Sequence, residues 1–146
     1  MQIFVLDDNL SDLFLTQAVF AKFSDQVTVT LYQTGQAVLD ALQLPDSVCP
    51  DVLLLEINTP QMNGFDVLKL LKADARLTLI PVVMLTTSVA AADIQEAYSM
   101  SASSYLVKSV DFSTFLQEVE SLVTFWISTR LLTWPALSSP ANACSP

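Results

Sequence analysis

Apolar residues follow two patterns along the chain: short runs, and longer stretches in which they recur at a helical spacing. The runs predict strands at residues 3–6, 26–32, 52–55, 81–85 and 105–107. The helical spacing predicts helices over residues 10–23, 34–43, 64–73, 90–100 and 111–127. Asn9 or Ser11 is suited to cap the first helix, and Thr34 and Asp111 are suited to cap the second and the last.

Strands and helices therefore alternate five times, which predicts an α/β fold with a parallel sheet and helices on both faces. Residues 52–55 are continuously apolar, as expected of a central strand that is covered on both sides. Five strands suit the doubly wound, flavodoxin-like strand order 2-1-3-4-5. The first helix has one apolar stripe, formed by Leu10, Phe14, Ala18 and Ala21.

The composition changes near the end of the chain. Residues 1–127 are expected to form one domain, whereas residues 128–146 are rich in Ser, Pro and Ala and hold a single charge, Arg130. This segment is expected to be a flexible tail. The alternative is that Leu131, Leu132 and Trp134 dock on the domain or on a second copy of the chain.

The charge balance bears on the partners. The net charge is −9, with 15 acidic against 6 basic residues, so nucleic acid is a poor partner, and metal ions or basic protein surfaces suit the chain better. No apolar run approaches the roughly 20 residues that a membrane helix needs. No basic region precedes the first apolar run, which argues against a signal peptide and makes the cytoplasm the expected location.

Polar side chains follow four of the predicted strands. Asp7 and Asp8 follow the first, Glu56 the third and Lys108 the fifth, and Thr86 ends the fourth. The carboxyl ends of parallel strands share one edge of the sheet, so these side chains should meet there. Clustered carboxylates repel each other and need a cation, and hard oxygen ligands suit Mg²⁺. A lysine beside that ion can hold an anion such as phosphate.

Four segments, "VLDDN", "DVLLLEINTPQMNG", "VVMLTTS" and "SYLVK", occur in an order and spacing that resemble a response-regulator receiver domain over about residues 2–127. The resemblance implies that Asp7, Asp8 and the backbone carbonyl of Asn58 help to bind Mg²⁺ beside the acid at position 56. It implies that a sensor histidine kinase phosphorylates that acid.

The same resemblance assigns roles to three further side chains. Thr86 and Lys108 are expected to contact the phosphoryl group, and Tyr105 is expected to change rotamer in the active state. The surface formed by residues 90–127 is expected to bind a sensor histidine kinase or a downstream signalling protein, or to form a homodimer.

Glu56 stands where the family has Asp. The extra methylene moves the carboxylate by about 1.5 Å. We therefore expect a receiver that is phosphorylation-independent or constitutively active-like and that acts through protein contacts, not as an enzyme. Loss of any active-like state is one alternative. A working phosphoacceptor, phosphorylated in a Mg²⁺-dependent reaction, is another, and an unrelated Mg²⁺-dependent hydrolase on the same fold is the least favoured.

Two more positions depart from the family pattern. Ser109 follows Lys108 where the family has a proline with a cis bond, so a trans or strained bond is expected, and the placement of Lys108 is in question. Ser101 lies near a position where the family commonly has glycine. Gly64 matches the family glycine at which the loop turns into the third helix.

Overall fold

The computed structural model describes residues 1–44 and 49–133, with side chains up to residue 128. Its parallel sheet has the strand order β2-β1-β3-β4-β5, which confirms the predicted topology. The strands are β1 (Gln2–Leu6), β2 (Thr28–Tyr32), β3 (Val52–Leu55), β4 (Val82–Thr86) and β5 (Ser104–Val107).

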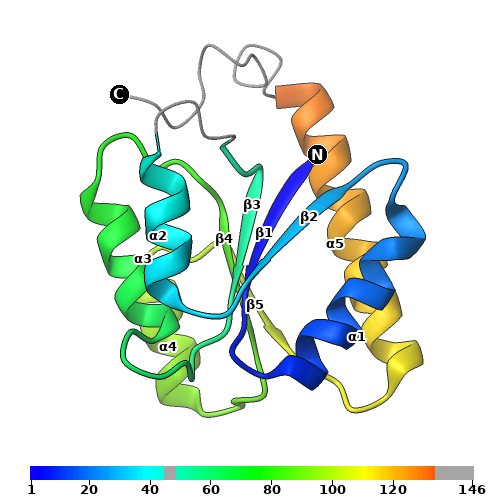
Figure 1. Ribbon diagram of the computed structural model, residues 1–146, viewed down its shortest axis with the longest axis horizontal. Coiled ribbons are helices and arrows are strands. Elements are labelled where there is room, and N and C mark those ends of the chain that lie inside the picture. The colour runs from blue at the N-terminus through cyan, green and yellow to red at the C-terminus, as the bar shows by residue number, and fades with distance from the viewer. Residues whose placement is uncertain (45–48, 134–146) are drawn as a thin grey trace.

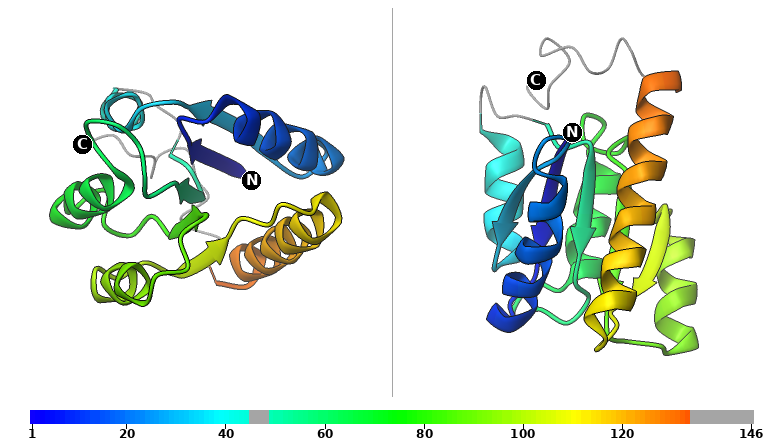
Figure 2. Two further views of the ribbon diagram at one scale, coloured as in Figure 1. Left: turned by 90° about the horizontal axis from the view of Figure 1, so that it is seen from below. Right: turned by 90° about the vertical axis from the view of Figure 1, so that its right-hand side faces the viewer.

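Five helices cover the two faces of the sheet (Figure 1). They are α1 (Leu10–Phe20), α2 (Gly35–Gln43), α3 (Gly64–Ala73), α4 (Ala91–Ser99) and α5 (Phe112–Thr133), and a short 3-10 turn, η1 (Ala21–Phe23), follows α1. Helices α1 and α5 lie side by side on one face, and α2, α3 and α4 lie on the other (Figures 1 and 2). Among the described residues, no helix is long and apolar enough to cross a membrane.

The alternation of side chains along each strand divides the core into two parts. Even positions of β1 and β4, such as Phe4 and Met84, pack towards α2, α3 and α4. Odd positions, such as Val5 and Leu85, pack towards α1 and α5. Strands β3 and β4 are buried along their whole length, so the residues that follow them begin in the interior of the protein.

The apolar stripe predicted on the first helix faces solvent. Leu10 is 57% exposed and Phe14 is 73% exposed. The opposite side of α1 is buried, and it is formed by Leu13, Thr16, Val19 and Phe20. Both sides carry apolar residues at a helical spacing, so the pattern alone could not show which one packs on the sheet.

The last helix is longer than predicted. We expected it to end near Ile127, but α5 continues to Thr133, so the predicted boundary after residue 127 falls within a helix. The sequence holds a signal for the true end, because Pro135 restricts the residue before it and cannot donate a backbone hydrogen bond. Residues 134–146, with Trp134 of the predicted tail, lie outside the described residues.

The C-terminus of α4 explains the position of Ser101. The backbone N–H of Ser101 donates to Tyr98, and that of Ala102 donates to Ala97, which together form a Schellman motif. This motif places Ser101 at φ 67°, in the left-handed region that favours glycine.

Ser101→Gly should therefore raise the free energy of unfolding by about 0.5–1 kcal/mol, because the left-handed conformation costs a serine more than it costs a glycine. Urea denaturation measures the change. Ser103→Gly is the matched control, since Ser103 is also exposed but has no positive φ, and this change should destabilise slightly. A Ser101→Gly protein that is no more stable than Ser103→Gly would contradict the assignment.

Candidate functional site

Polar side chains converge where the strands end, at the lower edge of the sheet in Figure 1. Asp7 follows β1, Glu56 follows β3 and Thr86 ends β4, and all three are buried. Lys108 follows β5 and reaches Asp7 and Glu56. Asp8 and the loop residue Asn58 are exposed. The structure thus brings Asp7, Glu56 and Lys108 into one cluster, with Asp8 and Asn58 turned to solvent.

Lys108 is the charged centre of this cluster. Its Nζ donates one hydrogen bond to Asp7 and a second, of 2.9 Å, to Asp12. Glu56 Oε2 lies 3.7 Å from the same Nζ, which is an ion pair but lies beyond hydrogen-bond range. One ammonium group therefore faces three carboxylates, and it is bonded to two of them.

Asp12 was not among the residues predicted to form the site. It lies in the first turn of α1, four residues after Asp8, which precedes the helix, and its side chain is 34% exposed. Its role could not be predicted from that spacing, because it depends on Lys108, which the fold brings close to α1.

Glu56 is held by its backbone, whereas its carboxylate is only partly paired. The backbone N–H of Glu56 donates to Leu6 at 2.9 Å, which extends the contact between β1 and β3 by one residue. The side chain is buried, and its Oε2 atom has no hydrogen-bond partner. A buried carboxylate oxygen without a donor is costly, so this atom marks an unsatisfied point in the site.

Gly64 fixes the loop against this same residue. A Cβ atom at position 64 would lie 2.3 Å from the carbonyl oxygen of Glu56, so a larger residue cannot fit there without moving the backbone. The φ of Gly64 is not positive, so the requirement is close approach and not a left-handed turn. Any side chain at position 64 would displace Glu56.

The lysine is well placed although Ser109 replaces proline. The Lys108–Ser109 bond is trans, and the backbone N–H of Lys108 donates to the carbonyl of Thr86 at 2.7 Å. Ser109 Oγ accepts from the N–H of Asp111 at 3.1 Å, which holds the loop in place of the proline ring. The expected disturbance of Lys108 is absent.

Tyr105 and Thr86 are linked through one residue of the β4–α4 loop. The Tyr105 hydroxyl donates to the carbonyl of Ser88 at 3.0 Å, and the N–H of Ser88 donates to Thr86 Oγ1 at 3.2 Å. Ser88 Oγ in turn donates to Asp93 on α4 at 2.5 Å. This chain of hydrogen bonds connects the sheet edge with α4 and β5, and Ser88 was not predicted to take part.

Burial raises the pKa of Glu56 above its usual value, and Lys108 and the Thr86 hydroxyl oppose the shift only in part. Burial also raises the pKa of Asp7, although the hydrogen bond from Lys108 opposes it. Burial alone would lower the pKa of Lys108, but its hydrogen bonds to Asp7 and Asp12 outweigh burial and raise it. The Lys108 ammonium is thus stabilised by its two hydrogen-bonded carboxylates, whereas Glu56 has no hydrogen bond from it.

The oxygen donors at this edge have the chemistry that Mg²⁺ prefers. Within the part of the chain that the structure describes, however, no three His, Cys, Asp or Glu side chains are grouped to hold a metal ion. Lys108 supplies positive charge to Asp7 and Glu56 instead. The residue types suit a divalent ion, but their side chains are not gathered around one point, and the Lys108 ammonium lies beside two of them.

Glu56→Gln should raise the free energy of unfolding at neutral pH by about 1 kcal/mol, because it removes a buried charge whose Oε2 atom has no hydrogen-bond donor. The raised pKa means that folded Glu56 keeps a proton above the ordinary value of 4.5, where the unfolded chain has lost it. Wild-type stability should therefore fall as the pH rises from 4.5 through the folded pKa, and Glu56→Gln should lack that loss.

Urea denaturation across this pH range measures the difference. Glu96→Gln is the matched control because Glu96 is exposed on α4, and it should follow the wild type. A Glu56→Gln protein whose stability parallels the wild type at every pH would show that burial of Glu56 carries no electrostatic cost.

Known proteins share this arrangement of elements. A family model of the response regulator receiver domain matches residues 3–120. The probable methanogenesis regulatory protein FilR2 of Methanothrix harundinacea is 31% identical over 137 residues, which covers 92% of this chain and 88% of that protein.

Two solved structures are also similar. The phosphorylated cyanobacterial phytochrome response regulator RcpA has a TM-score of 0.81 at 33% identity, over 88% of this chain and 94% of that one. The Mn²⁺-bound form of response regulator Rcp1 has a TM-score of 0.80 at 29% identity, over 92% of this chain and 99% of that one. Together with the sheet order and the polar edge of the sheet, these matches show that the chain belongs to the response regulator receiver domain family of two-component signalling.

Proposed function

We propose that this receiver signals through protein contacts without being phosphorylated at position 56. The observation that carries the proposal is the placement of Glu56, whose buried carboxylate lies 3.7 Å from Lys108 and close to Thr86. In the receiver family these are the two side chains that would contact a phosphoryl group. The carboxylate of Glu56 therefore extends into the space that such a group would need.

The chemistry of transfer supports the same conclusion. A carboxylate oxygen must approach phosphorus to about 3–3.5 Å and in line with the leaving group, and a displacement of 1 Å can cost about 10²-fold in rate. The extra methylene of Glu56 displaces the carboxylate by about 1.5 Å, which exceeds that 1 Å. Glu56 is therefore a poor nucleophile for phosphoryl transfer, and it imitates the phosphorylated side chain instead.

The substitution is only a partial imitation. A glutamate carries one charge, whereas a phosphorylated side chain carries about 1.5–2. The hydrogen bond from Tyr105 to Ser88, and that from Ser88 to Thr86, support an active-like arrangement in which the β4–α4 loop is tied to the site. We propose that Glu56 holds this arrangement constitutively.

We further propose that the site binds Mg²⁺ weakly through Asp7, Asp8, Glu56 and the backbone carbonyl of Asn58. A bound ion would supply positive charge that offsets the repulsion among these carboxylates. The related structure of Rcp1 contains Mn²⁺. Binding is expected to be weak in this chain because Lys108 already donates to Asp7.

The proposed partner surface is formed by residues 90–127. The exposed apolar side chains on it are Tyr98, Val110, Phe112 and Phe125. The exposed polar residues Gln117, Glu120, Ser121 and Thr124 lie beside Phe125 on α5. Exposed apolar area of this kind commonly marks an interface, which suits a sensor histidine kinase, a downstream signalling protein or a second copy of the chain.

A second candidate function is phosphoryl acceptance by Glu56 itself. Thr86 and Lys108, which would contact the phosphoryl group, are both present and lie near the carboxylate, and this favours the alternative. The two functions differ in one measurable outcome, which is whether the wild-type protein takes up label from a phosphoryl donor.

The wild-type protein should take up no label from acetyl phosphate, whereas Glu56→Asp should gain label that depends on Mg²⁺, because the shorter side chain restores the space for the phosphoryl group. Intact-mass spectrometry with peptide mapping measures the label. Glu56→Gln is the matched control, since it keeps the size of Glu56 but has no nucleophilic carboxylate. Strong labelling of the wild-type protein at Glu56 would overturn the proposed function and establish the second candidate.

A further inference from the structure

Lys108 is shared unequally among its three carboxylates. Its two hydrogen bonds go to Asp7 and Asp12, and Glu56 Oε2 lies 3.7 Å away without a hydrogen-bond partner. An ammonium group has three N–H donors, so the number of donors does not explain why Glu56 is left out. The position of the ammonium group does.

Asp7 cannot account for that position alone. Its Oδ1 accepts from the N–H of Asn9 at 3.0 Å, and the residue is buried, so Asp7 is fixed at the end of β1. The ammonium group can lean from Asp7 towards Asp12 on α1 or towards Glu56 after β3. The distances of 2.9 Å and 3.7 Å show that it leans towards Asp12.

We propose that Asp12 is a positioning residue that holds Lys108 on the α1 side of the site and so keeps it out of hydrogen-bond range of Glu56. When Asp12 loses its charge, Glu56 becomes the stronger acceptor for the third N–H. A movement of about 1 Å then brings Nζ to the roughly 2.8 Å that is normal for a charge-assisted hydrogen bond.

This competition makes the site sensitive to the solvent-accessible surface of α1. Asp12 is 34% exposed, so the carboxylate that sets the position of Lys108 can be reached from solvent, whereas Asp7 and Glu56 are buried. A positive charge brought to Asp12 from outside weakens its hold on Lys108, and the effect appears at Glu56. Its role in signalling rests on the proposed function, but the competition itself does not.

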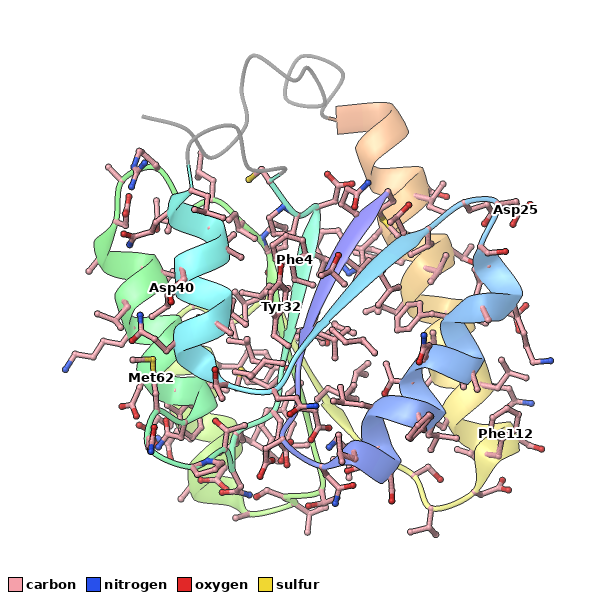
Figure 3. The ribbon with its side chains drawn as sticks, in the orientation of Figure 1. Phe4, Asp25, Tyr32, Asp40, Met62 and Phe112 are labelled. Carbon is pink, nitrogen blue, oxygen red and sulfur yellow. The ribbon has the colours of Figure 1, made fainter. Side chains whose placement is uncertain are left out.

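The test is the pair of side-chain signals that report directly on Lys108 and Glu56. Solution NMR of the full chain records the Lys108 ammonium ¹⁵Nζ–¹H correlation, assigned with Lys108→Arg, and the Glu56 carboxyl ¹³Cδ resonance, assigned with Glu56→Gln. The variants are Asp12→Asn, Asp12→Glu and the matched control Asp25→Asn. Asp25 is exposed and lies at the opposite end of the molecule from the site (Figure 3).

In Asp12→Asn the ammonium signal should persist but shift, and the Glu56 ¹³Cδ resonance should shift with it. A crystal structure of this variant should show the distance between Lys108 Nζ and Glu56 Oε2 shortened from 3.7 Å to hydrogen-bond range. Asp12→Glu, which keeps the charge, and Asp25→Asn should both resemble the wild type.

Loss of the ammonium signal in Asp12→Asn would mean that Asp12 only anchors Lys108, and unchanged signals at both residues would mean that it has no influence. Either result would overturn the proposal. Neither readout involves phosphoryl transfer, so failure here leaves the proposed function standing, and labelling of wild-type Glu56 would leave the role of Asp12 standing.

Discussion

One ammonium group forms ion pairs with three carboxylates at the carboxyl edge of the sheet, and the arrangement of the site depends on it. Lys108 is nearly buried, and two of its partners, Asp7 and Glu56, are buried as well. Taking such charges out of water costs several kcal/mol for each ion, so they must compensate one another. Asp7 and Glu56 follow β1 and β3, Asp12 lies on α1, and Lys108 follows β5, so this one side chain also connects segments that are far apart in the sequence.

Glu56 is incompletely paired because one ammonium group faces three carboxylates. We propose that the glutamate occupies, with a single charge, part of the space that an aspartate would leave for a phosphoryl group. Lys108 donates no hydrogen bond to the Glu56 carboxylate, and its two hydrogen bonds go to Asp7 and Asp12. In the account proposed here, Glu56 imitates the phosphorylated state in part and Asp12 competes with it for the lysine. Hydrogen bonds through Ser88 connect Thr86 at this edge of the sheet with α4 and Tyr105.

Much of this could be predicted from the sequence, because continuous apolar strands and the polar residues that follow them are local features. The strand order, the edge at which Asp7, Glu56 and Lys108 meet and the cap at Thr34 all followed from such features. The outward face of α1 did not, since both of its sides are apolar and only the packing decides between them. Asp12 and Ser88 were missed for a similar reason, because their roles depend on which partners the fold brings within reach.

The most direct measurement is the free energy of unfolding of Lys108→Met at neutral and at acidic pH. Removing one partner from a buried ion pair costs about 3–5 kcal/mol, so Lys108→Met should be destabilised by roughly that amount at pH 7. The loss should shrink as the carboxyl groups take up protons at low pH, whereas the control Lys69→Met, at an exposed position on α3, should be nearly neutral throughout. A Lys108→Met protein as stable as Lys69→Met at pH 7 would contradict the central role of this lysine.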